Sequence, residues 1–215
     1  MKPISLLVAL LATSSFAYPA AYDERSQDYP PPVSFGLEVG GILTMPVLWP
    51  SYGVDTKLGL GLRLVPEVQF ALGNHFELRG FAGYEFTTWG YRQANSDGTT
   101  DDFSVKSNFM TLGLAGQYDF ARRGSFASIG ISTDIPFRSV LTDDVNYGDG
   151  TGETLTGRFQ GEQSSMFLDF GLGRQLSPMV GIAVGYRLPL VPFYDNAGST
   201  VDLHQINVNL RFTLL

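Results

Sequence analysis

Residues 204–215, HQINVNLRFTLL, alternate between polar and apolar side chains almost to the end of the chain. The apolar set is Ile206, Val208, Leu210, Phe212 and Leu214. A period of two residues is typical of a β-strand, because successive side chains point to opposite faces. The segment is therefore predicted to be a strand whose two faces meet different surroundings.

The same alternation recurs along the chain and predicts eight strands. They are residues 34–45, 57–72, 76–91, 104–120, 126–137, 164–176, 179–190 and 203–215. Their connections are short at 73–75, 121–125 and 177–178, and long at 46–56, 92–103, 138–163 and 191–202. This order predicts an up-and-down antiparallel meander with the short turns and both termini at one end and four long loops at the other.

The distribution of small residues indicates which face is inside. An eight-stranded barrel is so narrow that side chains nearly fill it, so its inner face must carry many small residues. The small residues share the polar face, as at Gly36, Gly40, Gly59, Gly61, Gly83, Gly113, Gly130, Gly171 and Gly185. We therefore predict an all-β, transmembrane, eight-stranded antiparallel β-barrel with a polar packed interior and an apolar exterior facing lipid.

The first residues and the composition narrow the class of protein further. Residues 1–17 have the pattern of a signal peptide, with Lys2, a short apolar stretch and the sequence Ser15-Phe16-Ala17. Residues 18–32 are predicted to be an acidic, proline-rich periplasmic tether, and residues 33–215 the barrel. The chain has no cysteine and a net charge of −7, which argues against disulfides, thiolate metal sites and a nucleic-acid partner.

Taken together, the signal sequence, the strand count, the unequal connections and the final strand resemble the family of small eight-stranded outer-membrane β-barrels. The transmembrane domain of outer-membrane protein A is an example of that family, and the resemblance covers residues 33–215. It implies a location in the outer membrane with the termini on the periplasmic side. It also implies contact with outer-membrane lipid and lipopolysaccharide, and insertion by the barrel-assembly machinery.

Charged residues on the predicted inner face can be paired by arithmetic, because opposed residues of an antiparallel hairpin have a constant index sum. Arg63 should lie opposite Glu85 and Asp169 opposite Arg187, and closure of the barrel should bring Arg211 near Glu38. The whole predicted interior network is Glu38, Arg63, Glu67, Glu77, Arg79, Glu85, Asp119, Asp134, Asp169, Arg187 and Arg211. It could form an ion-selective passage or a packed polar core, and the narrowness of the barrel favours the core.

The longest predicted loop, residues 138–163, is the other candidate site. Its acidic residues are Asp143, Asp144, Asp149 and Glu153. They lack the spacing of an EF-hand calcium loop, so a solvated external loop is the favoured interpretation and neither a metal nor a cofactor is predicted.

The only histidines are His75 and His204. His75 falls in a short turn, and the parity of His204 points it toward lipid although Ser199 and Asp202 lie near it in sequence, so we predict that the chain is not an enzyme. The favoured role is structural or interactive: membrane integrity, adhesion, or recognition of an external ligand by the long loops. A narrow pore for small solutes or ions is the alternative, and a lipid-facing enzyme is the third possibility.

Overall fold

The computed structural model describes residues 33–49, 54–73, 75–121, 124–147, 149, 151–160, 162–196 and 199–214. The predicted signal peptide and tether, residues 1–32, lie outside the described residues and remain predictions. In the described part, no helix is long and apolar enough to cross a membrane.

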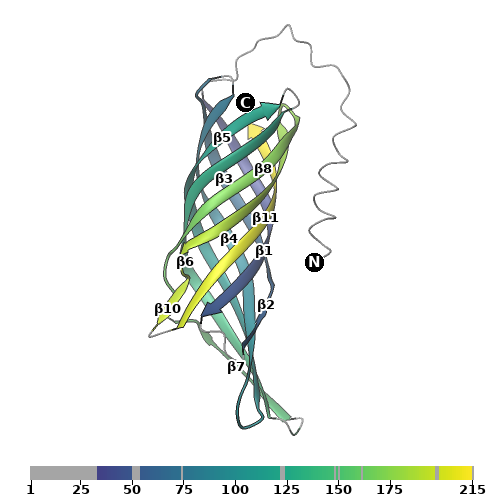
Figure 1. The fold of residues 1–215 in the computed structure, drawn as a ribbon, viewed down its shortest axis with the longest axis vertical. Helices are drawn as coiled ribbons and strands as arrows, with labels where there is room; N and C mark the ends of the chain where they lie inside the picture. The colour runs from purple at the N-terminus through teal and green to yellow at the C-terminus, as the bar shows by residue number, and fades with distance from the viewer. Residues whose placement is uncertain are drawn as a thin grey trace. The chain divides into compact units, whose positions relative to one another are not determined.

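Eight strands of the described residues close into an antiparallel hydrogen-bonded ring (Figure 1). Around the ring they are β1 (Val33–Trp49), β3 (Gly59–Ala71), β4 (Phe76–Ala94), β5 (Thr100–Ala121), β6 (Ser125–Tyr147), β8 (Ser165–Ser177), β9 (Val180–Val191) and β11 (Ser199–Leu214), and β11 pairs back with β1. Short strands flank this ring: β2 (Val54–Lys57) beside β4, β7 (Thr151–Arg158) beside β6 and β10 (Tyr194–Asn196) beside β11. The predicted eight-stranded antiparallel barrel is confirmed.

The tight connections lie at one end of the ring, here called the short-turn end. Val33 of β1 pairs with Phe70 of β3, and Phe35 pairs with Leu214 of β11, so the beginning of β1 and the end of β11 lie at this end too. Gly73 and Gly124 occupy the turns with φ of 134° and 69°, a region that side chains other than glycine rarely adopt. The opposite end is called the hairpin end.

Burial is inverted relative to that of a water-soluble protein. The side chains of Arg79 and Arg187 are almost wholly buried, at 3% and 1% exposure, whereas Leu60 and Leu62 are 69% and 67% exposed. An exposed apolar surface of this extent would cause aggregation in water and is required in lipid. The chain is therefore a membrane-spanning β-barrel of the outer-membrane type.

Inward-facing glycines leave room for the larger interior side chains. A Cβ atom on Gly113 would lie 2.3 Å from the ring of Phe81, and one on Gly173 would lie 2.3 Å from the ring of Phe126. Because the interior is packed, a side chain at either position would push the ring into its neighbours and destabilise the barrel. The small residues of the polar face thus make room for larger side chains in the narrow interior, as the sequence predicted.

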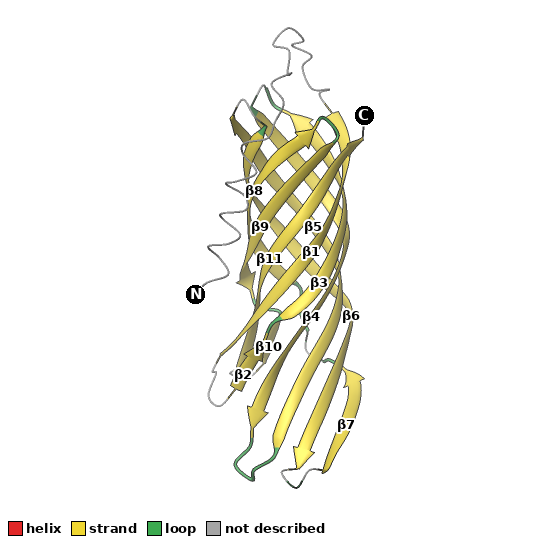
Figure 2. Cartoon of the chain, turned by 90° about the vertical axis from the view of Figure 1, so that its right-hand side faces the viewer, coloured by secondary structure: helices red, strands yellow, loops and turns green. Residues whose placement is uncertain are grey.

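The prediction that residues 92–103 and 138–163 are loops is wrong for most of their length. The β4–β5 pairing continues to Ala94↔Thr100, the β5–β6 pairing to Thr100↔Asn146, and the β6–β7 pairing to Tyr147↔Thr151. We call this extension the hairpin sheet: residues 90–94, 100–107, 139–147 and 151–158, which continue past the ring in Figure 2. Its threonines and valines suit a strand, and pairing satisfies the backbone polar groups that a loop would leave to water.

A β-bulge separates the barrel wall from the hairpin sheet on β6. Asn108 pairs with Arg138 but Phe109 pairs with Pro136, so Phe137 is an extra residue. The inward positions of β6 therefore change from even numbers, such as Asp134, to odd numbers, such as Ser139. The bulge consequently turns both Phe137 and Arg138 outward, where both are exposed.

Candidate functional site

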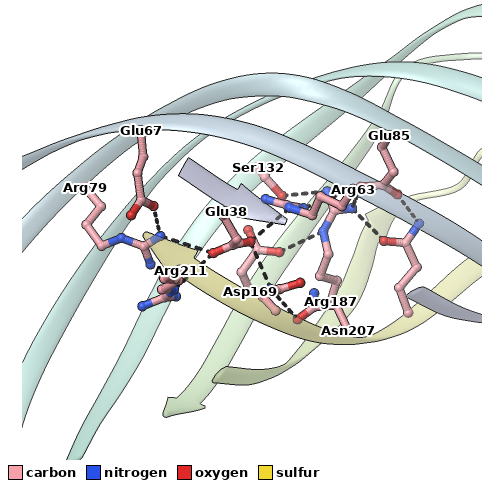
Figure 3. Close-up of polar contacts among 12 residues, drawn as sticks. Glu38, Arg63, Glu67, Arg79, Glu85, Ser132, Asp169, Arg187, Asn207 and Arg211 are labelled. Carbon is pink, nitrogen blue, oxygen red and sulfur yellow. Dashed lines mark hydrogen bonds and ion pairs between the residues drawn. The ribbon is translucent and has the colours of Figure 1, made fainter. Parts of the chain in front are cut away.

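Arg187 of β9 is the centre of a polar cluster in the middle of the barrel (Figure 3). Its guanidinium nitrogens lie 2.8 Å from Glu85 Oε2, 2.8 Å from Asp134 Oδ1 and 3.0 Å from Asp169 Oδ1. It also donates hydrogen bonds to Gln205 at 2.6 Å and to Ser132 at 2.9 Å. One cation thus faces three carboxylates from three other strands, β4, β6 and β8, which we call the Arg187 hub.

A second cluster surrounds Glu38, nearer the short-turn end. Its Oε2 atom accepts hydrogen bonds from Arg79 at 3.3 Å and from Arg211 Nε at 3.1 Å, while Asn209 donates to Oε1 at 2.9 Å. Arg79 is also paired with Glu67. The closing pair of the barrel therefore places Glu38 opposite Arg211, as the index sums predicted.

Arg63 of β3 connects the two clusters. Its Nε atom lies 3.2 Å from Glu38 Oε1 and its Nη1 atom 3.4 Å from Glu85 Oε2. The register pairs Arg63 with Glu85 and Asp169 with Arg187, again at the predicted positions. A cavity of about 50 Å³ remains beside Arg63, so side chains occupy most of the interior.

Two members of the predicted interior network are not part of these clusters. Asp119 is half-buried near the short-turn end and accepts a hydrogen bond from Gln117 at 3.3 Å. Glu77 is also half-buried there, and no hydrogen bond or ion pair joins its side chain to another described residue, although it interacts electrostatically with Arg79. Both project from the inner face toward the mouth of the barrel, at the edge of the Glu38 cluster.

Three interior phenylalanines were missed by the sequence analysis, and each has an arginine over its ring. Arg63 lies 5.2 Å from the ring centroid of Phe81, Arg187 lies 4.1 Å from that of Phe167, and Arg211 lies 4.8 Å from that of Phe126. A guanidinium over an aromatic face is attracted by the ring quadrupole. Their inward direction could have been predicted from the alternation of the strands, because each phenylalanine lies an even number of residues from an inward charged residue on its own strand.

An apolar cluster fills the interior at the hairpin end. Its buried members, here called the aromatic plug, are Trp89, Val105, Phe109, Phe193, Val201 and Leu203. Trp89 and Phe193 make an edge-to-face contact with ring centroids 5.8 Å apart, and Phe109 packs on Phe193 at 5.7 Å. Trp89 shares the inward parity of Glu85 on β4, but no pattern in the sequence indicates that several apolar residues meet there.

The acidic residues predicted for an external loop lie instead on the β6–β7 hairpin. Asp143 and Asp144 belong to β6, Glu153 belongs to β7, and Asp149 lies in the turn between them. Asp149 accepts hydrogen bonds from the Thr151 amide and hydroxyl at 2.9 and 2.6 Å, and these bonds hold its pKa below the usual value. The prediction of a loop is corrected here because the residues on both sides of this turn form paired strands.

These carboxylates do not converge on one point. Asp144 accepts a hydrogen bond from Thr154 at 2.7 Å, and Asp102 of β5 is paired with Lys57 and Arg92. Burial and the neighbouring Asp101 raise the pKa of Asp143. Within the described residues, no group of three or more acidic or histidine side chains could hold a metal ion.

Comparisons with known proteins found matches only among solved structures. No family model matches the chain, and no curated protein matches its sequence. One solved structure that matches is Ail, the attachment invasion locus protein of Yersinia pestis, in complex with the heparin analogue sucrose octasulfate. The match has 12% sequence identity and a TM-score of 0.40, and it covers 84% of this chain and 99% of Ail. Neisserial surface protein A matches at 14% identity and 0.39, over 85% of this chain and 97% of its own.

The outer-membrane protease OmpT of Escherichia coli matches at 11% identity and a TM-score of 0.41, over 85% of this chain and 95% of its own. The matches thus include a protease, an attachment invasion locus protein and a surface protein. At these identities they assign no activity to this chain, and its function has to follow from its own geometry.

Proposed function

We propose that this chain is a non-enzymatic outer-membrane anchor that displays the hairpin sheet outside the cell, where the sheet recognises an external partner. The short-turn end then faces the periplasm and the hairpin end faces the exterior. The observation that carries the proposal is that β4, β5, β6 and β7 continue as one hydrogen-bonded sheet beyond the ring.

The interior supports an anchor better than a passage. The Arg187 hub crosses the middle of the barrel, and the aromatic plug fills the hairpin end. An ion that passed would have to break several charge-assisted bonds and then cross a layer of buried aromatic side chains, where its desolvation would be costly. The interior charges accordingly serve to fix the register and closure of the strands.

The hairpin sheet has the properties of a recognition surface. In the described part of the chain β7 pairs with β6 alone, and all eight of its residues are exposed. An exposed edge strand offers unpaired backbone amides and carbonyls, to which an extended segment of a partner can add. The strand is held rigidly by its ladder to β6, so a partner that binds it would order little of this chain.

A non-enzymatic role is consistent with the surroundings of His204. Its Nδ1 atom lies 2.6 Å from the hydroxyl of Tyr186, a neighbour on β9, and the two rings stack with centroids 6.1 Å apart. Asp202 lies on β11 opposite Val47 of β1, and Ser199 pairs with Asn196. The His204 ring is therefore bonded to a tyrosine of the neighbouring strand, and no hydrogen bond joins it to Ser199 or Asp202.

The proposal can be tested by shortening one hairpin while keeping the barrel. Residues 143–155 would be replaced by Asn-Gly, which joins the paired residues Thr142 and Thr156 by a two-residue turn. Fluorescent proteoliposomes carrying either chain would be applied to an array of immobilised extracellular-matrix proteins and polysaccharides. The full chain should be retained on at least one spot from which the shortened chain is lost.

The matched control shortens the β4–β5 hairpin, with Asn-Gly replacing residues 93–101 between the paired residues Arg92 and Asp102. Retention of this variant would locate recognition on β6 and β7. Both variants must show the heat-modified gel migration of a folded barrel. Discrete conductance of the full chain in a planar bilayer, or equal retention of the full and shortened chains, would contradict the proposal.

A further inference from the structure

Three cations on the outward face lie just beyond the lipid-facing surface at the hairpin end. Lys106 of β5, Arg138 of β6 and Arg158 of β7 are all exposed. Their outward direction follows from their neighbours, because Val105 and Ser107 are buried on either side of Lys106, and Ser139 is buried beside Arg138. Phe159, next to Arg158, packs against the aromatic plug.

The register brings these cations together. Val140 of β6 pairs with Lys106 on one side and with Arg158 on the other, and Arg138 lies two residues before Val140. Directly opposed residues have Cβ atoms about 5 Å apart, and diagonal neighbours are about 7 to 8 Å apart. Arg138 is the diagonal neighbour of both other cations, so the three surround Val140 in a compact group that we call the basic triad.

The basic triad has no counterion in the described structure. No ion pair or hydrogen bond joins the side chain of Lys106, Arg138 or Arg158 to another described residue. By contrast, Lys57 and Arg92 on the same sheet are both paired with Asp102. Three grouped cations that have no counterion among the described residues are unexpected in a chain of net charge −7, since their mutual repulsion is unfavourable without an anion.

Aromatic side chains mark the level of the membrane interface beside the triad. Tyr84 and Phe137 are exposed on the outward face, with ring centroids 6.1 Å apart. The Tyr84 hydroxyl donates to Asn108 at 2.5 Å, and Asn108 donates to the backbone carbonyl of Arg138 at 3.1 Å. Aromatic rings of this kind lie at the headgroup level of a bilayer, so the triad begins where the headgroups are.

From this geometry we infer that the basic triad binds the phosphate groups of an anionic outer-leaflet lipid whose acyl chains lie along the apolar wall below. Arginine binds phosphate in a bidentate manner and lysine adds a point charge. The occupant is a lipid and not a free phosphate because the outward face of β5 continues from Lys106 through a single polar residue, Asn108, to the apolar wall that begins at Met110. This inference rests on the orientation given in the proposed function, with the hairpin end outside the cell, but not on recognition of a partner by the hairpin sheet.

The test uses the full chain, folded in zwitterionic detergent and titrated with a fluorescent diphosphorylated lipid A. Each cation near a charged headgroup contributes about fivefold in affinity, so Arg138→Gln with Arg158→Gln should weaken binding about 25-fold. The charge-conserving pair Arg138→Lys with Arg158→Lys should retain most of the affinity. The same lipid with its phosphates removed should bind the unaltered chain more weakly still, because Lys106 then loses its phosphate partner too.

The matched control is Lys57→Gln with Arg92→Gln, which removes the same number of charges from the same sheet. It should leave the affinity within about twofold, because these cations already have a carboxylate partner. The inference would be overturned if this control lost as much affinity as the Arg138 and Arg158 variant, or if that variant kept its affinity. It would also be overturned if the dephosphorylated lipid bound as tightly as the phosphorylated one. Millimolar inorganic phosphate should not displace the lipid, and displacement would contradict a lipid occupant.

Folding of each variant is checked by heat-modified gel migration. If the double Gln variant does not fold, two other measurements replace it. Lys106→Gln should weaken binding of lipid A about fivefold, and the unaltered chain should bind the dephosphorylated lipid more weakly. The hairpin truncation described above keeps residues up to Thr142 and from Thr156 onward, so it retains the basic triad. It should bind lipid A normally even if it has lost its external partner, which separates the two proposals.

Discussion

Replacing Arg187 by methionine should destabilise the barrel more than any change of a surface charge. Methionine roughly preserves the apolar volume of the arginine stem but removes the guanidinium, whose nitrogens lie within 3.0 Å of Glu85, Asp134 and Asp169. Removing one partner from a buried ion pair costs about 3 to 5 kcal/mol. We expect the upper part of this range, because three carboxylates lose a partner and the contact with the Phe167 ring, at 4.1 Å, is lost too.

The assay is urea unfolding of the full chain from lipid vesicles, followed by tryptophan fluorescence and gel migration. The matched control is Arg92→Met, which removes a cation that is 54% exposed and paired with Asp102. The control should cost less than about 1 kcal/mol. Adding Asp134→Asn to Arg187→Met should restore part of the lost free energy of unfolding, because one uncompensated charge disappears. If Arg187→Met lowers the free energy of unfolding by less than about 1 kcal/mol, the three carboxylates do not need Arg187 as their counterion and the reasoning is refuted.

Three further predictions concern other parts of the barrel. A double-mutant cycle on Arg63→Met and Glu85→Gln should show a coupling of about 0.5 to 3 kcal/mol in unfolding, and additive effects would disprove the pairing. Leu112→Arg on the lipid-facing wall should destabilise by about 2 to 4 kcal/mol, while Leu155→Arg on β7 should stay within about 0.5 kcal/mol, and equal effects would contradict the assigned lipid face. Burial acts to raise the pKa of Asp102, but the hydrogen bonds from Lys57 and Arg92 outweigh it and lower that pKa. The β2–β4 contact should therefore be stabilised above the usual Asp pKa and weaken as the pH falls through the lowered value, seen as faster hydrogen exchange in β2; persistence of that step in Asp102→Asn would exclude this carboxylate as its cause.

Much of the barrel could be predicted from alternation and turn length alone. A period of two assigns each residue to a face, and the short turn after Leu72 fixes the register that pairs Arg63 with Glu85. The requirement for a narrow, crowded interior then decides which face is inside. These predictions succeed because each depends only on side-chain alternation and turn length, which can be read from the sequence.

The hairpin sheet could not be predicted in the same way. Segments rich in Asp, Thr and Gly are compatible with a loop or with a strand whose two faces both meet water, and alternation is absent when both faces are polar. The bulge at Phe137 also changes which residues face inward. Pro136 is compatible with a bulge, but a proline does not by itself show that the strand contains an extra residue. The aromatic plug depends on contacts among β4, β5 and β11, and on Phe193, which lie far apart in sequence.

The Arg187 hub also bears on how long the folded barrel lasts. Its bond to Glu85 joins residues 102 positions apart, and the bond from Gln205 to Glu85 spans 120 positions. Such contacts form only after the ring has closed, so they lower the energy of the finished barrel more than that of the transition state for insertion. The hub should therefore slow the departure of the barrel from the membrane by a large factor while leaving the rate of its insertion almost unchanged.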